Sequence, residues 1–333
     1  GPAQTAPPHP PDAQQPVKHQ LKATPATVHW GHLQADLEPR LQVRSGDHVE
    51  IETFSGGRAD LSGDLSIVAP AHRDIIENVM PMDGPHILTG PIAVEGAQPG
   101  DCLEVRIETI RLGADWGYNL IRPGRGTLPD EFHQPRQNTF PIDRSRSITR
   151  LPWGIDVPLR PFFGVLATAP PPEWGRVSSV PPREFGGNID NKELIAGSSL
   201  FLPVFTEGAL FSAGDGHAVQ GDGEMDVTAL ETCMNGRFQL ILHPGRTLDA
   251  PRALTPTHLI TMGFDPDLDE AARQASHRML DWLTALTGWS REQAYIFSSL
   301  ACDIRITQLV NQNKGVHAMV RRDLLSLSEP ILP

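Results

Sequence analysis

Two stretches of the sequence share a pattern that constrains the fold more than any other feature. Residues 45–54 read SGDHVEIETF and residues 99–110 read PGDCLEVRIETI, so in each a Gly-Asp pair is followed by alternating apolar and polar residues. Alternation with a period of two is typical of a β-strand that buries one face. Strands that begin at tight turns of this kind are expected to assemble into antiparallel sheets.

Two later stretches support the same interpretation. Residues 199–215 (SLFLPVFTEGALFSAGD) contain two apolar runs around Glu207-Gly208, which predicts a strand pair that turns at those residues. Residues 226–243 (DVTALETCMNGRFQLILH) contain Asn235-Gly236, which predicts a hairpin because both residues tolerate positive φ. The body of the protein is therefore expected to be antiparallel β-sheet.

Helices are expected only near the end of the chain. One is predicted from Asp265, as its N-cap, to Gly288, where it stops. Ser290 and Gln293 have the spacing of a capping box and predict a second helix, and residues 303–311 (DIRITQLVN) predict a returning strand. The expected fold class is mainly β with a smaller α/β part, with sandwich-like or barrel-like antiparallel sheets plus C-terminal helices.

The sequence suggests three parts along the chain. Residues 1–27 are Pro-rich and are predicted to be a disordered leader, with the folded part starting near Val28. Residues 28–183 form an N-terminal β-rich part, in which 111–182 are rich in Pro and Arg and are predicted to be irregular. So long an irregular stretch is expected to line a site or a subunit contact. Residues 184–333 are expected to form a metal-site β part and the C-terminal α/β part.

Composition excludes several classes of protein. The formal net charge of -12 argues against a nucleic-acid or anionic-membrane surface, and no apolar run is long enough to span a bilayer. Cys102, Cys233 and Cys302 are far apart and form no CxxC motif, so they are expected to be free thiols. A Pro-rich start is typical of a chain whose signal peptide is removed, and it predicts a periplasmic or secreted protein, with a cytoplasmic one as the alternative.

An acidic cluster around one histidine is the main candidate site. Residues 208–226 (GALFSAGDGHAVQGDGEMD) place Asp215 and His217 one residue apart, so on an extended segment both point the same way. Nearby glycines allow the chain to bring Glu224 back toward them. Histidine and carboxylate ligands suit zinc, although a solvated acidic turn would have the same composition.

Four segments of the chain resemble the acetamidase/formamidase family in order and spacing. They are HILTGPIAVEGAQPGD, FGGNIDNKEL, LFLPVFTEGALFSAGDGHAVQGDGE and DIRITQLVNQNKGVHAM, and the resemblance covers nearly everything after Val28. It implies a β-rich fold, a homo-oligomer, and a metal-dependent hydrolase that converts small linear amides to ammonia and a carboxylate.

The resemblance also assigns roles to residues. The residues that fall on its metal-ligand positions are His86, Asp190, Asp215 and His217. Glu224 falls on the final acid of the QGDGE block and is expected to act as the general base, with a role as metal ligand as the alternative. The metal, with the Asn188 side chain or neighbouring backbone amides, is expected to stabilise the tetrahedral oxyanion. Zinc is the expected cofactor, and calcium is a second candidate because carboxylates are plentiful. Phe185 departs from the pattern, since some members carry His before the paired glycines.

Simpler interpretations of the same residues stay open at this point. A lone histidine before a strand, such as His86, is more often structural than ligating, and Asn188 with Asp190 would also fit an Asx-type turn. Two other functions compete with the amidase: a non-catalytic β-protein that binds a metal or a small ligand, and a hydrolase of another C–N bond, such as a cyclic or aryl amide.

Overall fold

The computed structural model describes residues 15–328 and 330–333, and the first fourteen residues of the predicted leader lie outside this range. The remainder of the leader is not all loop. Strand β1 (Lys18–Leu21) pairs in parallel with β5 (His48–Thr53), so that Leu21 lies beside Ile51. The folded part of the chain therefore begins before Val28, the start that the sequence predicted.

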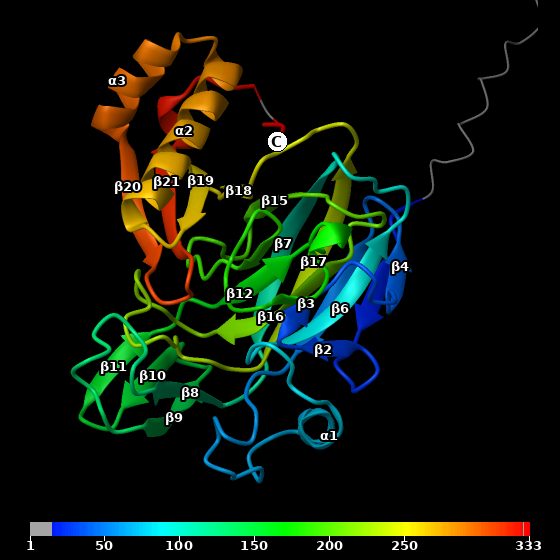
Figure 1. Cartoon of the computed structure of the whole chain (residues 1–333), viewed down its shortest axis with the longest axis vertical. Helices are drawn as coiled ribbons and strands as arrows, with labels where there is room; N and C mark the ends of the chain where they lie inside the picture. Colours follow the sequence, from blue (N-terminus) through cyan, green and yellow to red (C-terminus); the bar gives the residue numbers. More distant parts are fainter. Residues whose placement is uncertain (1–14, 329) are drawn as a thin grey trace, which may run out of the picture.

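The larger sheet crosses the whole molecule (Figure 1). Within the described residues it has nine strands in the order β1-β5-β17-β7-β15-β18-β19-β21-β20. The strands not yet introduced are β7 (Cys102–Leu112), β15 (Ser199–Pro203), β17 (Met234–His243), β18 (Arg252–Leu254), β19 (His258–Asp265), β20 (Cys302–Gln308) and β21 (Lys314–Arg321).

A second sheet packs on one face of the first. Its order is β14-β12-β16-β6-β2, with β4 paired in parallel to β6. The bounds are β2 (Val28–Trp30), β4 (Leu41–Val43), β6 (Ile87–Val94), β12 (Phe162–Ala167), β14 (Gly186–Asn188) and β16 (Phe211–His217). Both edges of β16 are paired, by β12 and by β6, so its residues are held firmly in the middle of this sheet.

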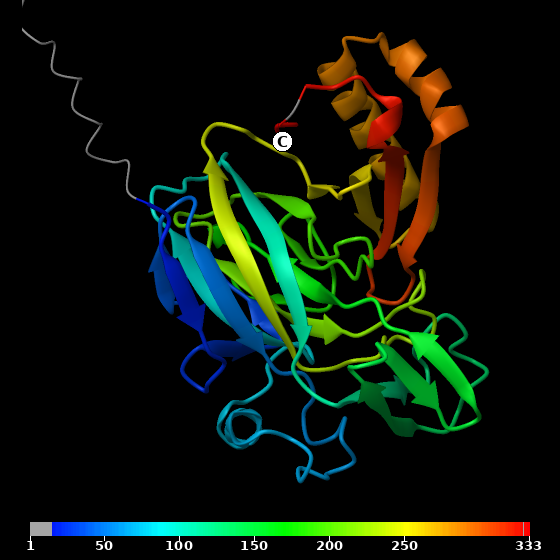
Figure 2. The same ribbon diagram turned by 180° about the vertical axis from the view of Figure 1, so that it is seen from behind.

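The main core lies between these two sheets. Phe238 of β17 contacts Phe163 of β12 and Phe211 of β16, with ring centroids 5.3 and 5.8 Å apart. All three rings are buried in one apolar cluster to which both sheets contribute. Burial of apolar area at about 25 cal/mol per Å² makes this interface the main stabilising contact between the sheets. The expected sandwich of antiparallel sheets is confirmed, and Figure 2 shows it from behind.

Residues 111–182 are more regular than the sequence predicted. They hold a separate sheet in the order β11-β10-β9-β8, which Figure 1 shows apart from the sandwich. Its strands are short and their outer faces are charged, which hides the alternation: in β9, Phe140 and Ile142 are buried between exposed residues. The bounds are β8 (Trp116–Ile121), β9 (Arg136–Asp143), β10 (Ile148–Leu151) and β11 (Ile155–Pro158).

The remaining short elements lie between the strands or after the last one. Helix α1 (Pro70–Asn78) buries His72 and Ile75. A two-stranded pair is formed by β3 (His32–Leu33) and β13 (Val177–Ser178), and 3₁₀ turns lie at 172–174 and 322–324. The three cysteines are free thiols, as expected.

The C-terminal part packs α2 (Leu268–Thr287) and α3 (Arg291–Ala301) against β19, β20 and β21. The N-cap is Asp267, whose side chain accepts a hydrogen bond from Asp269 N, and not Asp265, which ends β19. Gly288 ends α2 in the left-handed conformation, and the capping box of Ser290 and Gln293 is confirmed. No helix in the described residues is both long and apolar enough to cross a membrane.

Two predicted hairpins are wrong, and packing explains both. Asn235-Gly236 lies inside β17, where a Cβ on Gly236 would come within 2.7 Å of the Phe163 ring. The glycine therefore lets an aromatic ring lie on the strand instead of making a turn. The chain does turn at Glu207-Gly208, but β15 and β16 on either side enter different sheets, so the turn links the two layers of the sandwich.

Candidate active site

Strand β16 ends at the centre of the acidic cluster. Asp215 and His217 are both buried, and Asp215 Oδ2 lies 3.0 Å from His217 Nε2. Asp215 has a φ of 61°, and because this region costs a non-glycine residue energy, the surrounding sheet must hold it there. The expected convergence of these two side chains is therefore confirmed.

A glycine on the neighbouring strand makes room for the cluster. Gly164 of β12 faces the carboxylates, and a Cβ built on it would lie 2.3 Å from Asp215 Oδ2 and 2.5 Å from Asp190 Oδ1. It would also lie 2.9 Å from His217 Cε1. Any side chain at this position would occupy the space where the acidic groups meet.

Asp190 reaches the same place from the loop after β14. Its Oδ2 accepts a hydrogen bond from Asn311 Nδ2 at 2.6 Å, and its carbonyl oxygen accepts one from Gln220 Nε2 at 2.8 Å. These bonds hold Asp190 from two distant segments, while its Oδ1 is buried without a hydrogen-bond partner and lies 3.8 Å from His217 Nε2. Asp190 therefore directs an unsatisfied oxygen at the histidine.

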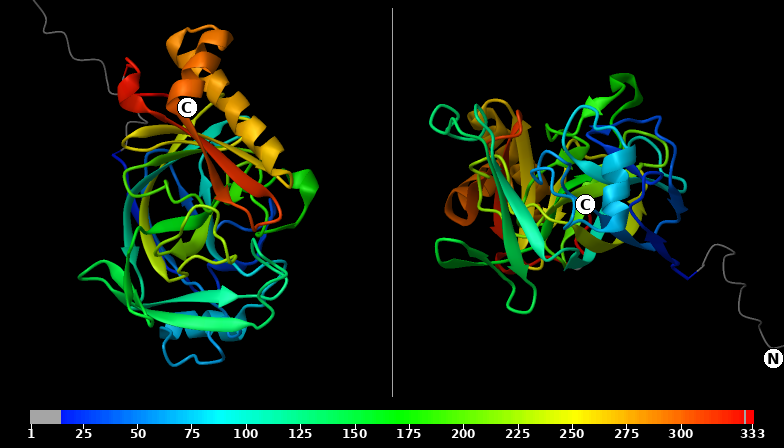
Figure 3. Two further views of the ribbon diagram at one scale, coloured as in Figure 1. Left: turned by 90° about the vertical axis from the view of Figure 1, so that its left-hand side faces the viewer. Right: turned by 90° about the horizontal axis from the view of Figure 1, so that it is seen from below.

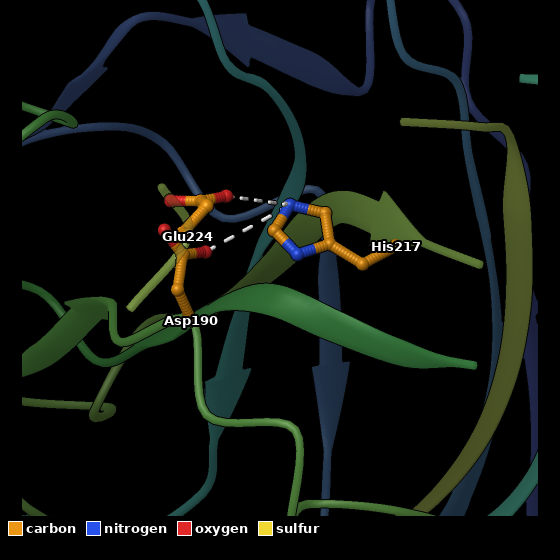
Figure 4. A group of neighbouring side chains, drawn as sticks. All are labelled: Asp190, His217 and Glu224. Carbon is orange, nitrogen blue, oxygen red and sulfur yellow. Dashed lines mark ion pairs between the residues drawn. The ribbon is translucent and has the colours of Figure 1, made fainter. Parts of the chain in front are cut away.

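Glu224 completes one group of donors around His217. Figure 4 shows Asp190, His217 and Glu224 pointing toward one another, with Glu224 Oε2 4.0 Å from His217 Nε2. One polar atom of each side chain is buried without a hydrogen-bond partner: Asp190 Oδ1, His217 Nε2 and Glu224 Oε1. Leaving three such atoms unpaired in one place is costly unless another group satisfies them. Asp222, which lies between His217 and Glu224 in the sequence, is instead near Lys192 and Arg305.

Glu231 is a member of the site that the sequence analysis missed. It lies just before β17, bridges to Tyr118 and to His217, and places Oε2 2.8 Å from His217 Nε2. With Asp215 and His217 it forms a second group of donors that share the same histidine. The available signal was a lone acidic residue between the apolar pair Ala229-Leu230 and Cys233, in a stretch expected to be buried strand.

His86 lies at the border of the cluster. Its Nδ1 is 2.7 Å from Ser179 Oγ, and its Nε2 is 3.8 Å from Asp215 Oδ2. Ser179 thus fixes the ring so that Nε2 is directed at the carboxylates, which is the orientation of a ligand or of a substrate contact. His86 belongs to neither of the two close groups of possible metal ligands.

The side-chain nitrogen of Asn188 is bonded to the loop before β14. Its Nδ2 donates to the Val180 carbonyl oxygen at 3.0 Å, and its main-chain carbonyl oxygen accepts a bond from Asn311 Nδ2, while its Oδ1 is buried without a hydrogen-bond partner. The side-chain nitrogen that was expected to stabilise an oxyanion therefore already makes one hydrogen bond within the loop. Phe185 is fully buried and packs on Trp174, with ring centroids 6.3 Å apart, so it belongs to the core.

A small cavity adjoins the cluster. Its volume is about 40 Å³, and its walls include His86, Asp215 and Glu231 from the cluster together with Tyr118 and Thr228. One water needs roughly 10–15 Å³ on this measure, so the space holds about three water-sized groups. A molecule with three or four non-hydrogen atoms would fit beside Glu231.

Burial and mutual repulsion alter the acidity of these groups. Burial raises the pKa of Asp190 to about 7, with a further increase from Asp215. Burial and the negative charge of Asp190 raise the pKa of Glu224 well above its ordinary value. Burial and the negative charge of Asp215 do the same to the pKa of Glu231.

For His217 and Asp215 the net shift of the pKa is opposite to the shift that burial alone would cause. Burial alone would raise the pKa of Asp215, but His217 and His86 hold it below its ordinary value. Burial alone would lower the pKa of His217, but Asp215 and Glu231 raise it well above the ordinary value. The site therefore gathers more negative charge than its histidines balance, which is the electrostatic setting of a cation site.

The donor set fits a divalent cation. Both groups of residues that could hold a metal are made of carboxylates and His217: Asp190, His217 and Glu224, and Asp215, His217 and Glu231. His217 Nε2 is buried 2.8 and 3.0 Å from two carboxylates without the geometry of a hydrogen bond to either. Mixed nitrogen and oxygen donors are those that zinc accepts.

Known proteins resemble this chain in sequence. It is 27% identical to the formamidase of Methylophilus methylotrophus over 304 residues, which are 72% of this chain and 72% of that protein. It is 31% identical to the acetamidase of Mycolicibacterium smegmatis over 199 residues, which are 42% of this chain and 49% of that protein. The chain therefore spans about half the length of the mycobacterial relative.

The fold and the family agree with these relatives. The crystal structure of a predicted acetamidase/formamidase from Thermoanaerobacter tengcongensis superimposes with a TM-score of 0.81 at 27% identity, over 93% of this chain and 98% of that one. The model of the Acetamidase/Formamidase family matches residues 16–178 and 173–320. Together these ranges cover nearly all of the described chain, and the protein belongs to the Acetamidase/Formamidase family.

Proposed function

We propose that the protein is an amidase that hydrolyses small linear amides, such as formamide and acetamide, to ammonia and a carboxylate. The observation that carries this proposal is the cavity of about 40 Å³ beside the buried His-carboxylate cluster. Formamide and acetamide have three and four non-hydrogen atoms, which matches the room available. The names of the two relatives support the same class of substrate.

We propose that a divalent ion, zinc with calcium as the second candidate, is held by Asp190, Asp215, His217 and Glu224. His86 is a further candidate ligand, because its Nε2 is directed at Asp215. When bound, such an ion supplies Lewis acidity and lowers the pKa of water. Gln220 supports the set by accepting a hydrogen bond from His217 Nδ1 at 3.0 Å, which leaves the Nε2 lone pair directed at the carboxylates.

Glu231 is the group best placed to move the proton. It is a wall of the cavity, whereas Glu224, the general base that the sequence predicted, is not. Burial, together with the charge of Asp215, raises the pKa of Glu231 well above its ordinary value, which favours the uptake of a proton. Hydrolysis adds the oxygen of water to the carbonyl carbon and breaks the C–N bond, and Glu231 carries one proton from water to the leaving nitrogen.

Tyr118 replaces Asn188 as the proposed donor to the oxyanion. It also forms a wall of the cavity, and burial, with the charge of Asp60, raises its pKa well above the ordinary value. The phenol therefore keeps its proton and can donate a hydrogen bond as negative charge develops on the carbonyl oxygen. Asn188 is not part of the cavity wall, and its Nδ2 already donates one hydrogen bond to the Val180 carbonyl oxygen.

A substrate panel with metal analysis tests this function. Ammonia release is measured with formamide, acetamide, an aryl amide and a cyclic amide, on protein whose metal content is known. Hydrolysis of the two smallest amides with about one divalent ion per chain is the expected result. Bound metal without hydrolysis of any amide would favour a binding protein, and hydrolysis of the cyclic or aryl amide alone would favour another C–N bond.

Two further properties are proposed with the activity. A homo-oligomer follows from the family resemblance and is measured by light scattering. A periplasmic or secreted location is also proposed, and fractionation of the native cells tests it. Recovery of the protein in the cytoplasmic fraction would contradict the proposed location.

A further inference from the structure

The outer edge of the larger sheet is open at β20. This strand is the last of the nine and pairs with β21 alone among the described strands. Figure 1 shows β20 and α3 at the margin of the molecule, and the left view of Figure 3 turns this margin toward the viewer. An unprotected edge strand is a template for pairing with another chain, and proteins normally cover or interrupt it.

The main-chain groups of Ile304 point outward from this edge. Arg322 N, at the end of β21, donates to the carbonyl oxygen of Thr257, so the main-chain groups of Arg322 point toward β19. The direction alternates along a strand, and the main-chain groups of Met319 and His317 therefore point the other way, toward β20. Their partners on β20 are Asp303 and Arg305, and Ile304 between them therefore faces away. Farther along, Gly223 already bonds the main chain of Thr307 and Leu309, so the open segment is 302–306.

An apolar strip runs along the open segment. Ile296 and Leu300, one turn apart on α3, are 55% and 85% exposed, and Ile304 and Ile306 on β20 are 55% and 40% exposed. The four side chains follow one another from the helix into the strand. Exposed apolar side chains gathered on adjoining elements mark a surface for association.

The charges of the segment complement those of its own copy. In an antiparallel pair centred on Ile304, Asp303 lies opposite Arg305 of the second copy, and the reverse pair forms by symmetry. Asp303 makes no ion pair with another described residue, and Arg305 has a single weak contact, 3.8 Å from Asp222. Residues 303 and 305 would be non-hydrogen-bonded pairs, in which opposite side chains come closest.

We propose that two copies of this chain associate through β20, in antiparallel register about Ile304. Ile304 exchanges both main-chain hydrogen bonds with its symmetry mate, the apolar strips meet on the helix side of the joined sheet, and two Asp303–Arg305 pairs form on the other side. The proposal concerns the surface of association and does not depend on which reaction the protein catalyses.

Charge reversal tests the register. Asp303→Arg and Arg305→Asp should each raise the dissociation constant of the dimer by at least about tenfold, because each places like charges opposite one another. Mixed in equal amounts, the two variants should associate with each other, since every opposing pair is then of opposite charge. Sedimentation equilibrium over a range of concentrations measures both results.

Two further variants separate this surface from any other. Ile304→Lys should also weaken association, whereas Met80→Lys, at a side chain that is 77% exposed far from β20 in sequence, should not. Circular dichroism confirms that each variant is folded. A wild-type monomer at high concentration, an oligomer that the three β20 variants leave intact, or the absence of association in the mixture would each overturn the proposal.

Discussion

Gln220 holds His217 by its Nδ1, with Gln220 Oε1 3.0 Å away, while Gln220 Nε2 donates to the Asp190 carbonyl oxygen. One amide side chain therefore positions both the histidine and the loop that supplies Asp190. A neutral imidazole that donates from Nδ1 presents its lone pair at Nε2, the nitrogen that faces the carboxylates.

Gln220→Ala should reduce metal affinity by about 10–100-fold, because His217 loses the bond that fixes its ring. Elemental analysis after dialysis against a graded series of chelator concentrations measures the change. Gln42→Ala, at an exposed position on β4, is the matched control and should bind metal as the wild type does. Equal metal retention by both variants would show that Gln220 does not position the ligand.

Glu231→Gln and Glu224→Gln should separate the base from the ligand. Glutamine keeps the size of glutamate but cannot take up a proton at neutral pH. Glu231→Gln should keep its metal and lose about 10²–10⁴-fold in turnover, whereas Glu224→Gln should lose metal and turnover together. Both quantities are measured on the same preparation. The reverse pattern would restore Glu224 as the general base.

His217→Ala should abolish metal binding, since both groups of donors share this residue. His86→Ala should weaken binding less, because its ring lies at the border of the cluster. His277→Ala is the control: this exposed histidine contacts Arg291 on the C-terminal helices, and its loss should leave metal content unchanged. Metal loss in His277→Ala with retention in His217→Ala would disprove the site.

Removal of metal should lower the thermal midpoint by about 5–10 °C at neutral pH, because the ion stabilises the folded state in proportion to its binding free energy. The buried carboxylates would then repel one another without compensation. Differential scanning calorimetry with chelator, followed by addition of zinc, measures the loss and its recovery. An unchanged midpoint would argue against a tightly bound ion.

Glu104→Gln should destabilise the protein at pH 7 by about 1–3 kcal/mol. Burial would raise the pKa of Glu104, but hydrogen bonds from Arg106, His243 and Ser199 outweigh it and lower the pKa below its ordinary value. The stabilisation is therefore present above the unfolded-state pKa and is lost as pH falls through the lower folded-state pKa.

Urea titrations at pH 7 and at about pH 3 check this dependence. The difference between wild type and Glu104→Gln should shrink at the lower pH, because a pH of about 3 lies below the ordinary pKa of glutamate and protonation then favours the unfolded state. Glu50→Gln is the control, because the Glu50–Arg111 pair is exposed and should contribute at most about 1 kcal/mol. A constant difference between the two pH values would show that ionisation of Glu104 is not the cause.

The sequence predicted the parts of the site that are close together along the chain. Asp215 and His217 follow from their spacing on an extended segment, and the structure brings Asp190 to them as the resemblance implied. Glu231 and Tyr118 could not be found in this way, because neither is part of a local motif. Their place depends on a bridge between segments more than 100 residues apart, which no short-range pattern encodes.

The errors in the fold have a similar origin. Asn235-Gly236 has the local chemistry of a turn, but the packing of the Phe163 ring against β17 keeps this dipeptide in the strand. The N-cap of α2 moved from Asp265 to Asp267 because β19 continues through Asp265 to complete its pairing with Lys314. In both places long-range pairing overrides a local preference that was correctly recognised.

Because β17 lies between β5 and β7, the central part of the larger sheet cannot form until β17 has been synthesised. The two outer strands leave the ribosome first, but the strand that separates them ends about 130 residues after β7. At about 5–20 residues per second, the interval lasts roughly 7–25 s. During this interval the nascent chain carries two strands whose facing edges have no partner. Such edges are binding sites for chaperones, and slow translation of this region would lower the yield of folded protein.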